Sequence, residues 1–262
     1  IATFTPTLNY VGRGRFDFTV TDSAGHAWTQ TFAILVANSG LPRDLSWNGA
    51  GNTWDSSAIN WFRPANNTNV AFSVGDRVTF DQSGIAQSNV NVSGTNSPGS
   101  VTVNAQGNYT FNGTGAISSS GELIKRGSGT LTVSNTGTNG FSSVSLDEGL
   151  LSLSGFNAAG SGKMSLNGGS LFLTTAIGNA LEFNSPTSIT VGSQQTMTGN
   201  WTGSQEVTVN GTSSYLWSLS GTWTGFTGSI RMGTGNAKIR INGGTSNTMF
   251  GSPAVAVDLG SG

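Results

Sequence analysis

The chain has 262 residues, of which only 9% are charged, and its formal net charge at pH 7 is −1. Such a balance leaves no basic field for nucleic acid, and no apolar run reaches the roughly twenty residues that cross a bilayer, so we expect neither partner. The composition includes 39 glycines and no cysteine, which excludes disulfide bonds and thiolate metal sites.

The first predicted element is a β-hairpin within residues 1–38. Phe16, Phe18 and Val20 alternate with polar residues, and a Ser-Ala-Gly turn separates them from a second apolar strand. This segment resembles the last strands of bacterial immunoglobulin-like or cadherin-like modules. The positions that carry the likeness are Phe16, Phe18, Val20, Asp22 and Gly25. Because a whole sandwich needs about seven strands, the resemblance implies a partial module whose missing strands come from upstream sequence or from another subunit.

Residues 39–89 combine a linker with a tryptophan-rich block. The linker has turn-forming composition, and Trp47, Trp54 and Trp61 follow it before an alternating strand over residues 74–81. The open apolar end of a solenoid must be covered, and large aromatic side chains in an irregular stretch can do this. We therefore expect this block to be a cap.

Residues 90–262 carry a spaced repeat. Apolar triplets at residues 131–133, 151–153 and 171–173 recur about twenty residues apart, which is typical of a coiled β-structure. The gaps between strands alternate between long and short, so the sum of two gaps repeats, as expected when two strands form each coil. The sequence predicts an all-β fold, a right-handed parallel β-helix, preceded by the partial immunoglobulin-like β-sandwich segment.

Residues 122–133 read Glu-Leu-Ile-Lys-Arg-Gly-Ser-Gly-Thr-Leu-Thr-Val. They resemble the autotransporter-associated β-strand repeat, Leu-x-Lys-x-Gly-x-Gly-Thr-Leu-x-Leu-x-Gly followed by Val-x-x-Gly-x-Leu. The corresponding positions are Leu123, Lys125, Gly127, Gly129, Thr130, Leu131, Val133, Val144, Gly149 and Leu151. A weaker likeness extends over most of residues 45–262. The resemblance implies a secreted or surface-exposed β-helical passenger of a large bacterial protein, although one full repeat is present here rather than a long series.

Catalytic chemistry finds little support in the sequence. The single histidine, His26, lies in the hairpin turn, where we expect it to be solvated. Parallel β-helices can host polysaccharide lyases and hydrolases, but Asp147, Glu182 and Glu206 lack the matched spacing that would gather carboxylates in one cleft. Lys163 and Glu182 stand about one coil apart, which predicts a surface ion pair. We expect no enzymatic activity, with a β-helical lyase or hydrolase as an alternative.

Metal and cofactor sites are not predicted. Asp55, Asp76 and Asp81 surround the cap block, but they lack the alternating Asp/Asn loop and bidentate Glu that hold calcium. Paired glycines elsewhere are not followed by a helix, so they lack the donors and dipole of a phosphate loop.

Trp201 and Trp223 leave two interpretations open. Indole faces on a flat β surface can stack on sugar rings, which makes this pair a hypothetical polysaccharide-binding site. The alternative is that both side chains pack in the core or seal turns.

The favoured hypothesis is a non-catalytic extracellular module of a large bacterial surface protein, acting as a rigid stalk, adhesin segment or fibre-forming subunit. The partial immunoglobulin-like edge and the terminal coil suggest end-to-end self-association into a filament. The main alternative is a β-helix that binds a surface polysaccharide.

Overall fold

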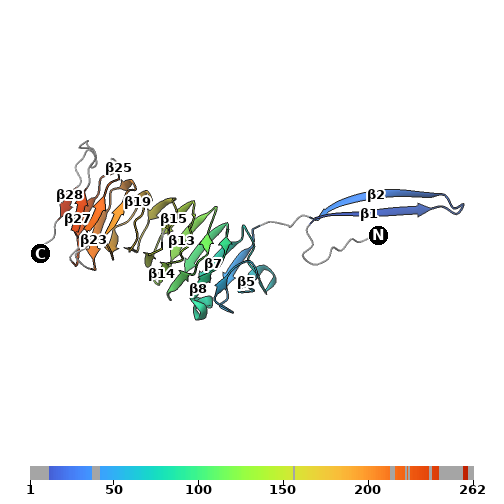
Figure 1. The fold of residues 1–262 in the computed structure, drawn as a ribbon, viewed down its shortest axis with the longest axis horizontal. Coiled ribbons are helices and arrows are strands. Elements are labelled where there is room, and N and C mark those ends of the chain that lie inside the picture. The colour runs from blue at the N-terminus through green and yellow to red at the C-terminus, as the bar shows by residue number, and fades with distance from the viewer. Residues whose placement is uncertain are drawn as a thin grey trace. The chain divides into compact units, whose positions relative to one another are not determined.

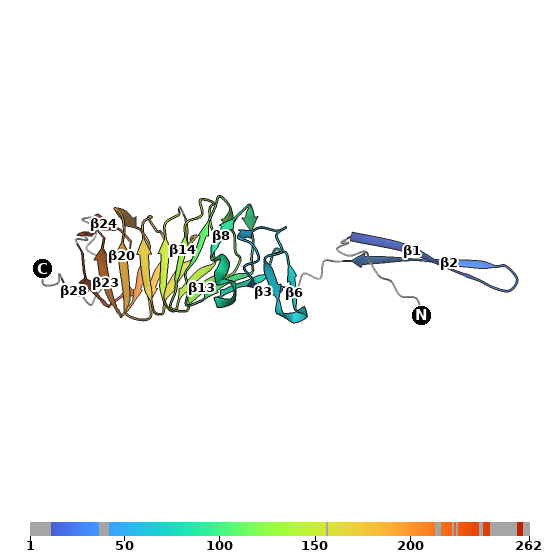
Figure 2. The same cartoon turned by 90° about the horizontal axis from the view of Figure 1, so that it is seen from below.

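The computed structural model describes residues 12–36, 42–155, 157–212, 216–221, 223, 225–235, 238–241 and 256–258. The chain divides into two compact units, Ile1–Leu41 and Pro42–Gly262. Strands make up 51% of the structure and helix 4%, and the second unit is a stack of parallel coils with about seven turns (Figures 1 and 2). The prediction of an all-β parallel solenoid is confirmed.

The first unit contains an antiparallel ribbon of two strands, β1 (Gly12–Thr21) and β2 (Ala27–Val36), in the place of the predicted hairpin. Asp22 closes the turn, because its carboxylate accepts the backbone N–H groups of Ala24 and His26. The His26 side chain is 83% exposed and contacts Asp22 at 2.9 Å, so it is the solvated turn residue that the sequence predicted.

Two long sheets form the second unit. The first contains β3 (Asp44–Trp47), β5 (Trp61–Arg63), β6 (Thr68–Val70), β7 (Arg77–Asp81), β10 (Ser100–Asn104), β13 (Glu122–Arg126), β15 (Ser143–Leu146), β17 (Lys163–Leu166), β19 (Leu181–Phe183), β22 (Trp201–Gly203) and β25 (Gly225–Phe226). The second contains β4 (Thr53–Trp54), β8 (Asn89–Val92), β11 (Tyr109–Asn112), β14 (Thr130–Val133), β16 (Leu150–Leu153), β18 (Ser170–Leu173), β20 (Thr187–Val191), β23 (Glu206–Gly211), β26 (Ser229–Met232) and β28 (Ala256–Asp258).

Shorter elements complete the coils. They are β9 (Thr95–Asn96) with β12 (Ala116–Ile117), the sheet of β21 (Gln195–Met197), β24 (Leu216–Leu219) and β27 (Lys238–Ile241), and the 3-10 turns η1 (Pro64–Asn66) and η2 (Gln82–Gln87). None of the helical segments in these described ranges has the length and apolarity needed to span a bilayer. Of the predicted terminal coil, only β28 lies within the described residues.

Each regular coil gives one strand to each long sheet, in order from β7 and β8 to β22 and β23. The registers place Leu131, Leu151 and Leu171 opposite one another on neighbouring strands, and all three side chains are fully buried. The repeat in the sequence therefore corresponds to a column of stacked side chains in the core. Because a strand alternates its side chains between two faces, this register keeps the apolar residues of every coil inside.

The turn from the first sheet to the second recurs with a left-handed glycine. Gly127, Gly149 and Gly169 have φ values of 71°, 74° and 70°, which only glycine adopts at low cost. At Gly149 the preceding coil also approaches closely, because an added Cβ would lie 2.4 Å from the carbonyl oxygen of Gly127. The repeated glycine thus allows both the bend and the stacking of the corners.

An aromatic cluster fills the N-terminal end of the solenoid. Trp47, Trp54 and Trp61 are fully buried, and the rings of Trp47 and Trp61 meet edge to face at a centroid distance of 5.0 Å. Strands β5 and β6 continue the first sheet beyond β3 in antiparallel fashion. The parallel sheet therefore begins at β3, which pairs with β7, and not at the expected boundary at residue 90.

Candidate functional site

The structure places Trp201 and Trp223 in the core. Their relative exposures are 0% and 1%, and their rings stack on each other with centroids 4.3 Å apart and planes inclined by 9°. Trp201 also contacts Phe183 and Phe226 at centroid distances of 4.8 and 5.6 Å. The packing interpretation is thus correct and the sugar-platform hypothesis is wrong for this pair, because neither indole face reaches solvent.

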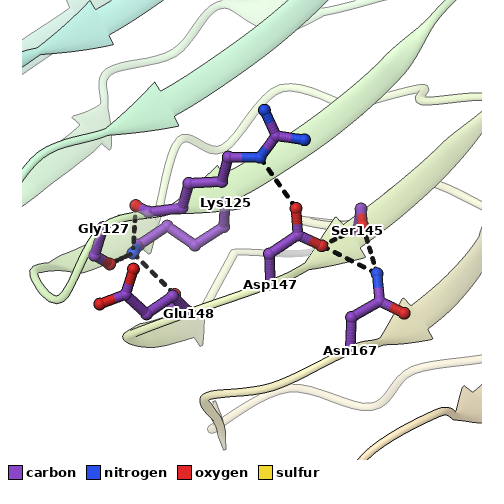
Figure 3. A network of polar contacts seen from close by, with 7 residues as sticks. Lys125, Gly127, Ser145, Asp147, Glu148 and Asn167 are labelled. Carbon is purple, nitrogen blue, oxygen red and sulfur yellow. Dashed lines mark hydrogen bonds and ion pairs between the residues drawn. The ribbon is translucent and has the colours of Figure 1, made fainter.

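The most unusual charged group is Lys125. Its strand, β13, alternates Leu123 and Lys125 toward the interior, and Lys125 is only 1% exposed. The ammonium donates to the carbonyl oxygens of Gly127 at 2.6 Å, Arg126 at 2.9 Å and Glu148 at 3.0 Å (Figure 3). Two of these acceptors belong to one corner turn and the third belongs to the next coil, so Lys125 joins two stacked corners.

Burial lowers the pKa of Lys125 to about 8, and the negative charge of Glu148 opposes this shift. The ammonium has three N–H donors, and all three are engaged by backbone carbonyl oxygens. A nucleophilic lysine needs a neutral, accessible nitrogen with a free lone pair. The geometry around Lys125 is instead that of a structural cation.

A ladder of polar side chains runs along the outside of the same corner. Asp147 accepts hydrogen bonds from Arg126 Nε at 2.9 Å, Asn167 Nδ2 at 2.8 Å and Ser145 Oγ at 2.7 Å (Figure 3). Asn184 continues the ladder with a 2.8 Å hydrogen bond to Asn167. Partial burial alone would raise the pKa of Asp147, but the hydrogen bonds from these three neighbours outweigh it and lower the pKa.

The other carboxylates considered for lyase or hydrolase chemistry are not brought together. Glu182 lies on β19 of the first sheet and forms the predicted ion pair with Lys163 at 2.8 Å. Glu206 lies on β23 of the second sheet, 3.9 Å from Arg231. Asp147, Glu182 and Glu206 therefore serve different local contacts on different coils, and they do not line one cleft.

The aspartates of the cap block fix turns and one ion pair. Asp55 accepts the N–H groups of Ser57 and Ala58, and Asp81 accepts the N–H group of Ser83. Within the described ranges, no group of three His, Cys, Asp or Glu side chains could hold a metal ion.

Asp76 pairs with Arg43, a contact that sequence reasoning missed. The two residues are 33 positions apart, and no local pattern connects them. Their contact closes the start of the solenoid unit onto the turn that precedes β7.

Among the hollows on the described part of the solenoid, two were not predicted from the sequence. One, of about 420 Å³, is lined by Gln82, Asn104, Ala105, Gln106, Gly127, Ser128 and Glu148. The other, of about 370 Å³, is lined by Ser46, Asn48, Phe62, Pro64, Asp81 and Ser83. The first holds no aromatic side chain, whereas the second combines an aromatic ring with amide, hydroxyl and carboxylate groups.

Comparison with protein-family models, with curated proteins and with solved structures finds no match to this chain.

Proposed function

We propose that this chain is a non-catalytic structural and adhesive module of a large bacterial surface protein, located outside the cell. It serves there as a rigid stalk or as a fibre-forming subunit. The observation that carries the proposal is the continuous stack, in which columns such as Leu131, Leu151 and Leu171 run through neighbouring coils. Each coil of a solenoid packs only on its neighbours, so such a fold supplies length and a repeated surface.

The charged residues of the stack support this role, because they link one coil to the next. Lys125 binds carbonyl groups of two successive corners, and Arg126 reaches Asp147 across the same step. Lys163 and Glu182 form a third link. Contacts of this kind resist sliding and splaying of the coils, which is what a load-carrying stalk requires.

The likeness of residues 122–133 to the autotransporter-associated β-strand repeat supports an exported location. Two of its positions have a clear physical role here, since Lys125 ties the corners together and Gly127 makes the left-handed turn. The likeness of the β1–β2 ribbon to the end of an immunoglobulin-like module favours the same setting, because such modules are common in surface proteins.

Self-association end to end is part of the proposal. Strands β5 and β6 already occupy the N-terminal edge of the first sheet, so a second copy cannot simply extend the parallel stacking there. The β1–β2 ribbon is a better contact surface, because Phe18, Val20 and Trp28 are 49%, 50% and 60% exposed. A two-stranded ribbon is only marginally stable by itself, which favours its completion by further strands.

Electron microscopy of the native surface assembly tests the proposal. We expect rods or fibres that contain the solenoid, together with no turnover of cell-surface polysaccharides by the purified protein. Compact particles without rods, combined with cleavage of a polymer, would reject it.

A further inference from the structure

The hollow lined by Ser46, Asn48, Phe62, Pro64, Asp81 and Ser83, here called the Phe62 hollow, lies on the outer face of the first sheet at its N-terminal end. We propose that it binds one pyranose ring of a neutral glycan. The proposal deepens the adhesive part of the proposed function and rests on it for its biological setting.

The strand pairing builds the hollow. Phe62 of β5 lies opposite Ser46 of β3, and Ser46 lies opposite Thr79 of β7. Residues two positions apart on a strand share a face, so Asp81 points to the same side as Thr79, and Asn48, which follows the end of β3, lines the same hollow. The result is an aromatic wall on β5 and polar groups at β3, its neighbour, and on β7, the strand beyond β3.

The ring of Phe62 is available to a ligand. Its neighbour Trp61 is fully buried in the aromatic cluster, and strand alternation turns Phe62 to the opposite, partly exposed side. Phe62 makes no ring contact with that cluster. Phe62 and the exposed Pro64 together form an apolar wall. The C–H face of a pyranose is apolar and can stack on an aromatic ring of this kind.

The polar side of the hollow suits sugar hydroxyl groups. Asp81 Oδ1 accepts the N–H and the hydroxyl of Ser83 at 2.8 and 2.5 Å, and Asn48 Oδ1 accepts the N–H of Ala50 at 2.9 Å. These bonds hold the carboxylate and the amide in place, while Asp81 Oδ2 and Asn48 Nδ2 make no hydrogen bond to the described residues. One acceptor and one donor on residues that line the hollow are thus available to a ligand, and the carboxylate disfavours anionic ligands.

Saturation-transfer NMR on the 262-residue chain tests this site, with the methyl glycosides of glucose, galactose, mannose and N-acetylglucosamine as probes. We expect transfer to the C–H protons of one ring face of at least one glycoside. Phe62→Leu keeps an apolar side chain but removes the ring, and it should weaken binding about fivefold. Asp81→Asn should weaken binding by a similar factor, and the new amide oxygen can still cap η2.

Ile59→Ala is the matched control, because Ile59 is 60% exposed in the same cap block and does not line the hollow. It should leave the affinity unchanged. Absence of transfer to all four glycosides, or unchanged affinity in both Phe62→Leu and Asp81→Asn, would overturn the proposal. Binding of a polyproline peptide without any glycoside would also overturn it, since the hollow would then serve a protein partner. None of these outcomes depends on the rods or fibres that test the proposed function.

Discussion

Arg43 forms a bidentate ion pair with Asp76 at the start of the solenoid unit. Its Nε and Nη2 atoms donate to the two carboxylate oxygens at 2.9 and 2.5 Å. The carboxylate side chain is only 3% exposed, and it also accepts the backbone N–H groups of Arg43 and Ser73. Arg43 in addition donates to the carbonyl oxygen of Ala71. This contact fastens the residue just before β3 to the turn before β7.

Arg43→Met should lower the free energy of unfolding by about 3 kcal/mol, because it leaves a buried carboxylate without its cation. Arg77→Met is the control, since Arg77 and Asp44 form a pair whose side chains are 50% and 73% exposed. Removing that exposed, solvent-screened pair should cost much less than the Arg43→Met substitution. Urea denaturation measures both, and equal losses in the two variants would contradict the role assigned to Asp76.

Lys125→Met should lower the free energy of unfolding by about 2 kcal/mol at pH 7, because three backbone carbonyl oxygens lose their donor. Methionine keeps the apolar stem of the side chain, so the loss reports mainly on the ammonium. Urea denaturation at neutral pH provides the measurement. A variant as stable as the parent chain would show that water or small shifts replace these bonds at no cost.

The stability contributed by Lys125 should depend on pH. Burial lowers its pKa to about 8 in the folded chain, below the ordinary value of 10.5, so between pH 8 and 10 the unfolded chain binds more protons than the folded chain. The free energy of unfolding should therefore rise with pH in this window, relative to Lys125→Met. Denaturation curves at pH 7, 8, 9 and 10 test the sign. The lowered pKa of Lys125 would be refuted if the difference in the free energy of unfolding between the parent chain and Lys125→Met stayed constant or fell over this pH range.

Gly149→Ala should destabilise the chain by more than about 2 kcal/mol, since its φ of +74° and the contact with Gly127 O both oppose a side chain. Gly75→Ala separates the two causes. Gly75 has a φ of +89°, but an added Cβ would meet nothing within 4 Å, so only the backbone cost of about 1–2 kcal/mol applies. In thermal or urea unfolding, Gly149→Ala should be less stable than Gly75→Ala. The reverse order of stability would count against close stacking of the corners.

Trp201→Ala should destabilise the solenoid by about 3–5 kcal/mol, because it removes a fully buried ring from the contacts with Trp223, Phe183 and Phe226. A surface sugar platform would instead tolerate the substitution with little loss of stability. Calorimetry of the parent and variant distinguishes these outcomes. Retention of the parent melting temperature would mean that Trp201 lies at the surface.

Much of the architecture could be predicted from local pattern. The columns of Leu131, Leu151 and Leu171 follow from a period that fixes both the coil length and the register, and the Lys163–Glu182 pair follows from the same period. The orientation of Lys125 could also be predicted, because Lys125 stands two positions after Leu123 on one strand and therefore shares the inward face of Leu123. Sequence reasoning treated it only as a motif residue.

Other features depend on contacts that no local pattern contains. Trp201 opens a strand of three residues, too short for alternation to reveal its face, and its burial follows only from its register with Leu181. The Arg43–Asp76 pair joins the segments that precede and follow Trp47, Trp54 and Trp61. The Phe62 hollow likewise arises from antiparallel pairing of β5 with β3, in a block where only a cap was expected.

The most direct test of the stacked-coil arrangement is a distance between two outward positions of one column. Thr130 and Thr208 stand four strands apart in the second sheet, and the chain has no cysteine of its own, so two introduced cysteines can carry spin labels. Neighbouring strands are about 4.8 Å apart, so four steps span about 19 Å. Pulsed electron paramagnetic resonance on the spin-labelled Thr130→Cys/Thr208→Cys variant should therefore give one narrow distribution of label-to-label distances at about 19 Å. A broad distribution, or a mean distance above about 30 Å, would contradict the parallel stack on which the proposed stalk depends.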